Sequence, residues 1–147
     1  MEENIISGFQ NTGISASGNN LIVSKNVVKQ GSTNKGISLS GDSIEILDNI
    51  IEGGEKGISG SGDSASIRGN HVSFTTGDPV TWTGASLEIL ENTIGGGQNA
   101  INGSGDSVMI SGNQISHNNA DSIHWTGDDL EISNNNINGG THGIEGS

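Results

Sequence analysis

The sequence contains no cysteine, no tyrosine, a single proline and only five basic residues among its 147 positions. Without cysteine, neither disulfides nor thiolate metal sites can form. Seventeen acidic residues give a net charge of −12, which argues against nucleic acid and anionic membranes as partners. The same charge disfavours acidic polysaccharides as ligands, unless a bound cation bridges the two.

Long apolar runs are also missing, because no stretch approaches the roughly 20 residues that a membrane-spanning helix requires. The opening residues Met1, Glu2 and Glu3 do not resemble a signal peptide. Hydrophobic residues make up 29% of the chain and aromatic residues 3%, a composition that alone suggests disorder. The regular spacing of those few apolar residues indicates instead that they stack into one narrow core.

One repeating unit accounts for nearly the whole chain. Segments 42–62, 63–84, 85–105, 106–127 and 128–147 each carry an apolar-x-apolar triplet, then an Asn, an apolar residue, a small-residue turn and a second triplet. The Asn recurs every 21 to 23 residues, at positions 4, 26, 49, 70, 92, 113 and 135. A period of this size predicts a solenoid, in which each coil buries its apolar face against its neighbours.

Within each unit, apolar and polar residues alternate at the strand period of two, and no helical period is present. We therefore expect three short strands per coil, each pairing in parallel with its equivalent in the next coil. The predicted fold class is all-β: a parallel β-helix (solenoid) of about six to seven coils, with residues 1–147 forming a single domain.

The Asn column predicts an inward ladder, because an Asn at a bend can donate its amide to the next coil. Seven positions in register favour a ladder over simple turn residues. Its six internal members are Asn26, Asn49, Asn70, Asn92, Asn113 and Asn135.

A second column alternates large and small residues along the third strand. It reads Ala16, Leu39, Gly60, Trp82, Gly103, Trp125 and Gly146. Trp82 and Trp125 each lie two positions after an inward Val or Ile, so their side chains are expected to face inward as well. We therefore interpret the two indoles as a core stack, in which the glycines leave room for the rings. A sugar-stacking platform is the alternative.

A third column places Asp after the Gly that closes the third strand, as Asp42, Asp63, Asp106 and Asp128. Such a column could bind calcium. Ala85 interrupts it, and Gly-Asp is ordinary turn chemistry, so solvated turns are the preferred interpretation.

Coils of the form LEIxxNxIxxG…GIxxSG resemble those of the right-handed parallel β-helix proteins of the pectate-lyase-like superfamily. That resemblance implies the right-handed fold. The superfamily includes polysaccharide lyases, hydrolases and epimerases as well as tailspikes and surface proteins, so the resemblance leaves the activity open. It leads us to expect an extracellular or cell-surface protein.

Enzymes of that superfamily place catalysis beneath long loops, and the longest candidate loop here is the short segment 29–35. Arg68 is the only arginine, and Glu45, Glu88 and Glu131 are expected on an open outer face. The four histidines, His71, His117, His124 and His142, fall in different coils and phases, so we expect no metal cluster. We interpret the chain as non-catalytic and without a cofactor, with a remnant of a polysaccharide lyase, hydrolase or epimerase as the alternative.

The most regular outward surface belongs to the third strand, where small hydroxyl residues recur in every coil. The residues expected to form a binding face are Ser38, Ser40, Ser59, Ser61, Thr81, Thr83, Asn102, Ser104, His124 and Thr126. A flat hydroxyl face suits an extended polysaccharide or another polar surface. Ice is an alternative ligand, and a plain solvent-facing sheet is the structural alternative to any binding role.

The ends of the repeat carry no amphipathic helix or covering loop, which predicts an excerpt of a longer solenoid. Outward apolar residues concentrate in the first coils, at Ile5, Ile22, Val27 and Ile50. We therefore expect the N-terminal end to contact a parent-protein domain or a second copy of the chain.

Overall fold

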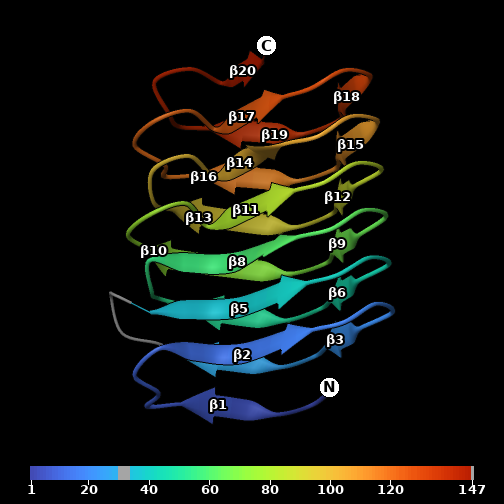
Figure 1. Ribbon diagram of the computed structural model, residues 1–147. Coiled ribbons are helices and arrows are strands. Elements are labelled where there is room, and N and C mark those ends of the chain that lie inside the picture. Colours follow the sequence, from blue (N-terminus) through green and yellow to red (C-terminus); the bar gives the residue numbers. More distant parts are fainter. Residues whose placement is uncertain (30–33, 147) are drawn as a thin grey trace.

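The computed structural model describes residues 1–29 and 34–146, and it is a parallel β-solenoid of about six turns (Figure 1). The chain winds upward as a right-handed coil, which is the usual handedness of connections between parallel strands of one sheet. Three sheets, here called A, B and C, form the walls. The predicted fold class is confirmed.

Sheet B takes the strand that follows each ladder Asn, and its seven strands lie in coil order. They are β1 (Ile5–Ser7), β4 (Val27–Lys29), β7 (Ile50–Glu52), β10 (His71–Thr75), β13 (Thr93–Gly96), β16 (Gln114–Ser116) and β19 (Asn136–Asn138).

Sheet C takes the third strand of each coil and faces the viewer in Figure 1. Its strands are β2 (Thr12–Ser17), β5 (Lys35–Ser40), β8 (Lys56–Ser61), β11 (Val80–Thr83), β14 (Ile101–Ser104), β17 (Ile123–Thr126) and β20 (Ile144–Gly146).

Sheet A takes the first strand of the repeat and has six strands. They are β3 (Ile22–Ser24), β6 (Glu45–Leu47), β9 (Ser66–Arg68), β12 (Glu88–Leu90), β15 (Val108–Ser111) and β18 (Leu130–Ser133). Within the described ranges there is no helix, and hence none long and apolar enough to cross a membrane.

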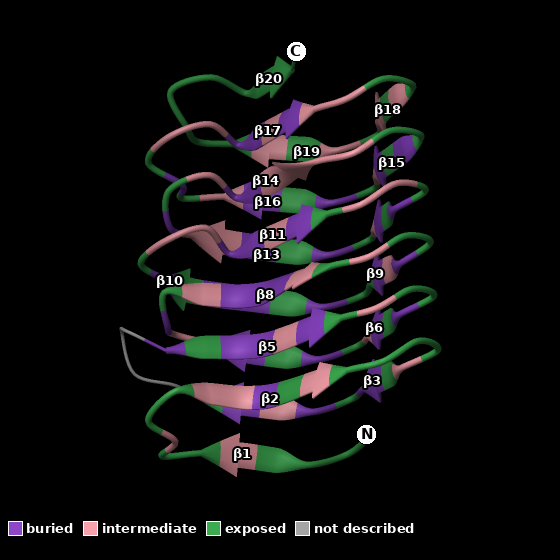
Figure 2. Cartoon of the chain, viewed as in Figure 1, coloured by how far each residue is buried: buried purple, intermediate pink, exposed green. Residues whose placement is uncertain are grey.

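The strands pair in the register that the repeat predicts, so equivalent residues form straight columns. On sheet C, Ile58 pairs with Val80 and Trp82 pairs with Gly103. Inward columns from all three sheets fill the narrow interior, where Val23, Ile51 and Ile101 are fully buried. Figure 2 shows buried positions alternating with more exposed ones along many of the strands.

Both tryptophans lie in the core, with Trp82 1% and Trp125 0% exposed. A Cβ added at Gly60 would overlap the Trp82 ring, and one at Gly103 would lie 2.5 Å from Cζ3 of Trp125. Each indole therefore lies across the glycine of the preceding coil. The ring N–H groups donate to main-chain carbonyls at 3.0 Å, Trp82 to Gly62 and Trp125 to Gly105.

The asparagine ladder is also confirmed. Each Asn side-chain oxygen accepts from both the main-chain and side-chain N–H groups of the preceding Asn; for Asn70 onto Asn92 the distances are 2.9 and 3.0 Å. The Asn92 amide also donates to the Ile67 carbonyl at 2.9 Å. Five of its six internal members are at most 2% exposed: Asn26, Asn49, Asn70, Asn92 and Asn113. Their polar groups are satisfied without water.

Replacing Asn92 by alanine is expected to lower the free energy of unfolding by about 1–3 kcal/mol, because it leaves the buried Asn70 donors unpaired. Denaturant unfolding measures this change. Asn136→Ala removes an exposed Asn from the outer face of β19 and serves as the control, with a change within about 0.5 kcal/mol. Equal stabilities of the two variants would refute the ladder.

The Gly-Asp turns form a second, exposed ladder. Gly62 has a φ of 131°, and a Cβ there would overlap the Gly41 carbonyl, so the turns stack too closely for any side chain. The Asp42 carboxylate accepts from the main-chain N–H of Asp63 at 3.0 Å, and Asp63 accepts from Ala85 at 2.8 Å. These carboxylates thus cap the turn of the next coil, which agrees with the solvated-turn interpretation.

Candidate functional site

All ten residues of the predicted binding face line one shallow groove of about 650 Å³ on the outer face of sheet C. The groove runs across β5, β8, β11, β14 and β17. Lys35 and Lys56 complete its side-chain lining, while main-chain atoms at Gly60 and Gly103 form part of its floor. We call this surface the sheet C groove.

The strand register arranges these side chains as two parallel rows. The first row contains Ser38, Ser59, Thr81, Asn102 and His124, and the second contains Ser40, Ser61, Thr83, Ser104 and Thr126. Successive members of a row lie on adjacent strands, about 4.8 Å apart. The rows are about 6.6 Å apart because their members are two positions apart along each strand. The result is a regular lattice of small polar groups.

The second row consists entirely of hydroxyl groups, and most of them are open to a ligand. Ser40, Ser61 and Thr83 are exposed, and their hydroxyl groups make no hydrogen bond with another described residue. In the first row, by contrast, Ser59 is buried and its hydroxyl donates to the Ile37 carbonyl at 3.4 Å. The second row therefore offers the donors and acceptors of the groove.

Charge differs between the two ends of the groove. The lining includes two lysines, Lys35 and Lys56, and no carboxylate. At the other end, the Asn102 amide donates to Asp78 at 2.7 Å, and His124 lies 3.5 Å from Asp121. The described lining thus carries two lysine charges at its β5–β8 end, and Asp78 and Asp121 lie beside its β14–β17 end, although the whole chain carries a net charge of −12.

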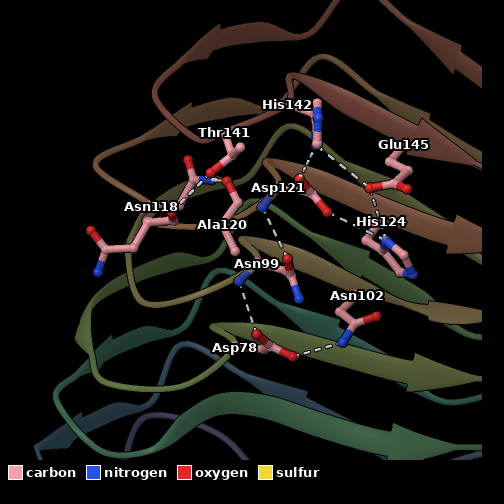
Figure 3. A network of polar contacts seen from close by, with 11 residues as sticks. Asp78, Asn99, Asn102, Asn118, Ala120, Asp121, His124, Thr141, His142 and Glu145 are labelled. Atoms are coloured by element: carbon pink, nitrogen blue, oxygen red, sulfur yellow. Dashed lines mark hydrogen bonds and ion pairs between the residues drawn. The ribbon is translucent and has the colours of Figure 1, made fainter.

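A chain of polar contacts borders the groove along the start of the sheet C strands (Figure 3). The Asp78 carboxylate accepts a hydrogen bond from the main-chain N–H of Asn99 at 2.9 Å. The side-chain oxygen of Asn99 in turn accepts one from the main-chain N–H of Asp121 at 3.0 Å. His142 follows, with its Nδ1 2.8 Å from Asp121. The sequence analysis did not predict this column of polar residues. The pattern that could have revealed it is a polar residue two positions before each inward Val or Ile of the third strand.

The acidity of the Asp121 carboxyl in this border departs from its ordinary value. The hydrogen bond from His142 lowers the pKa of the Asp121 carboxyl, although partial burial acts in the opposite direction. Asp121 therefore stays ionised to lower pH than a free aspartate and remains available as an acceptor.

The expectation that the histidines lie apart needs correction for two of them. His124 and His142 both contact Asp121, at 3.5 and 2.8 Å. His71 is exposed on sheet B, and His117 contacts Ser116 at 2.9 Å. The side chains of His124 and His142 come close together because His124 lies on β17 and His142 lies just before β20, the paired strand of the next coil.

The features considered for catalysis lie on open surface. Glu45, Glu88 and Glu131 share the outer face of sheet A but alternate with Ser66 and Met109. Arg68 pairs with Glu91 at 2.9 Å, and both side chains are more than half exposed. The centre of the candidate loop 29–35, residues 30–33, lies outside the described residues. The described residues thus do not place an Arg base beside a carboxylate cluster in a cleft.

A second hollow, of about 450 Å³, lies on sheet B beside Phe74. Phe74 is 79% exposed and has a φ of 59°. In the neighbouring coils, glycines (Gly53 and Gly96) take the same position of the turn. A bulky residue in this backbone region is an outlier. This backbone conformation could not be predicted, because the length of a turn alone does not determine its backbone angles.

Comparison with protein-family models, with curated proteins and with solved structures gives no match to this chain. The fold and the groove therefore rest on the chain's own geometry.

Proposed function

We propose that this chain is a non-catalytic binding module, and that its sheet C groove holds an extended neutral polysaccharide. Placement in the pectate-lyase-like superfamily, and action outside the cell or at its surface, belong to the same proposal. Their support is the repeat form LEIxxNxIxxG…GIxxSG, which recurs through most of the chain.

The groove itself carries the proposal. It is long and shallow, it crosses five adjacent strands, and ten side chains of matching character line it. Extended sugar chains present hydroxyl groups at regular intervals, and the exposed second row offers a complementary series of donors and acceptors. Because a neutral polysaccharide carries no charge, the chain's net charge of −12 does not repel it, whereas an acidic polysaccharide would be repelled.

Ice is the weaker alternative for the same rows. Thr81 and Thr83 are the one Thr-x-Thr pair in the groove, because the other pairs contain Ser, Asn or His. Ser lacks the methyl group of Thr, and His124 is tied to neighbouring carboxylates. An ice-growth assay, run beside the glycan assay, separates the two ligands.

The test is binding of the parent and two variants to an array of neutral and acidic glycans. Thr83→Arg places a long side chain in the groove and is expected to weaken binding of a neutral glycan at least tenfold. Thr93→Arg makes the same change on the exposed outer face of β13 and should bind like the parent. Binding to no glycan, or equal binding by Thr83→Arg and the parent, would overturn the proposal.

A further inference from the structure

Four side chains converge where β17 and β20 meet the polar border of the groove (Figure 3). The segments Asp121-Ser-Ile-His124 and His142-Gly-Ile-Glu145 lie in register, with Ile123 paired to Ile144 and His124 to Glu145. The same register places Asp121 beside His142. Each coil thus supplies one imidazole and one carboxylate, in opposite order.

The distances between these groups suit a small metal ion. His142 Nδ1 lies 2.8 Å from Asp121 Oδ1 and 3.6 Å from Glu145 Oε2. His124 Nδ1 lies 3.5 Å from Asp121 Oδ2 and 3.8 Å from Glu145 Oε2. With metal–ligand bonds of about 2.0–2.2 Å, neighbouring ligands of a tetrahedral zinc ion lie about 3.3–3.6 Å apart. Three of the four contacts are within a few tenths of an ångström of this spacing. One ligand atom each from Asp121, His142 and Glu145 lies within 4.8 Å of the others, and His124 approaches this group from β17.

The main chain holds the two segments in place. The N–H of Ser122 donates to the His142 carbonyl at 3.0 Å, and that of Ile123 donates to Gly143 at 3.1 Å. On the other side, Asn99 accepts from the Asp121 main-chain N–H at 3.0 Å. Admitting an ion requires that His142 and Asp121 separate slightly, which exchanges their hydrogen bond for two metal bonds. It also requires that the His124 ring move toward the other three ligands.

We propose that Asp121, His124, His142 and Glu145 form a binding site for one divalent transition-metal ion, with Zn²⁺ as the best match. Two imidazoles favour zinc over magnesium or calcium, which prefer all-oxygen sites. Two carboxylates neutralise the charge of the ion. His142 and Glu145 are 62% and 52% exposed, so an ion reaches the site directly from solvent.

The experiment titrates untagged protein with Zn²⁺ by calorimetry, beside Ca²⁺. One Zn²⁺ per chain is expected, with little heat from Ca²⁺. His142→Ala should weaken zinc binding at least tenfold. His71→Ala removes an exposed histidine from the outer face of β10 and should leave it unchanged. Visible absorption of the Co²⁺-loaded protein gives a second readout, because tetrahedral Co²⁺ absorbs far more strongly than the aqueous ion.

Three results would overturn the site: no saturable Zn²⁺ binding by the parent, unchanged affinity in His142→Ala, or tighter binding of Ca²⁺ than of Zn²⁺. Circular dichroism of each variant shows whether the fold is kept. If His142→Ala unfolds, Glu145→Gln takes its place, because it removes a carboxylate ligand but keeps the size of the side chain. This variant must then weaken Zn²⁺ binding at least tenfold.

Discussion

Trp82→Ala is expected to lower the free energy of unfolding by about 3–5 kcal/mol, the range for removing a large buried aromatic side chain. The indole is 1% exposed and lies across Gly60 of the preceding coil, so its loss opens a cavity in the middle of the stack. The Gly62 carbonyl also loses its partner at 3.0 Å. Denaturant unfolding followed by circular dichroism measures the change.

Trp82→Phe is the matched control, because it keeps most of the ring volume but cannot donate to Gly62. Its loss should fall clearly below that of the alanine variant. A loss of less than about 1 kcal/mol for Trp82→Ala, typical of a surface site, would contradict the buried stack. Strong quenching of the parent's tryptophan fluorescence by a soluble quencher would contradict it equally.

Gly103→Ala is expected to destabilise the protein by at least about 1–3 kcal/mol, the usual cost of overpacking. In an ordinary strand the same change is favourable by roughly 0.5–1 kcal/mol, because glycine is the poorer strand residue. At Gly103 the added Cβ would overlap the Trp82 carbonyl oxygen and lie 2.5 Å from the Trp125 ring. Both neighbours are buried, so neither can move aside cheaply.

Gly146→Ala is the control in the same column, one coil beyond Trp125. There the nearest atom to an added Cβ is the Trp125 carbonyl oxygen, at 3.5 Å, which is ordinary contact. The midpoint of unfolding should therefore stay unchanged or rise slightly. A Gly103→Ala variant as stable as Gly146→Ala would show that the rings do not lie over the glycines.

Much of this architecture could be predicted because each coil repeats the same local chemistry. The period-two alternation of Ile44, Glu45 and Ile46 sets which residues face inward, and the fixed spacing of Asn70 and Asn92 sets the register. Once register is fixed, the columns follow, including the tryptophans and the hydroxyl rows. The ten groove residues were predicted for this reason.

The features that could not be predicted depend on contacts between residues at different positions of the repeat. His124 and His142 belong to different columns, and they meet only because Asp121 and Glu145 lie between them on adjacent turns. The strained backbone of Phe74 likewise depends on how its turn stacks on the neighbouring coils. Such contacts need the actual path of the turns, which the repeat period does not specify.

The most direct test of the binding role is an amide chemical-shift titration of isotope-labelled protein with a neutral β-1,4-linked hexasaccharide drawn from the glycans that the array identifies. The account predicts that the shifted signals belong to β5, β8, β11, β14 and β17 and cluster around Ser61, Thr83 and Ser104. Shifts confined to sheets A and B would contradict it.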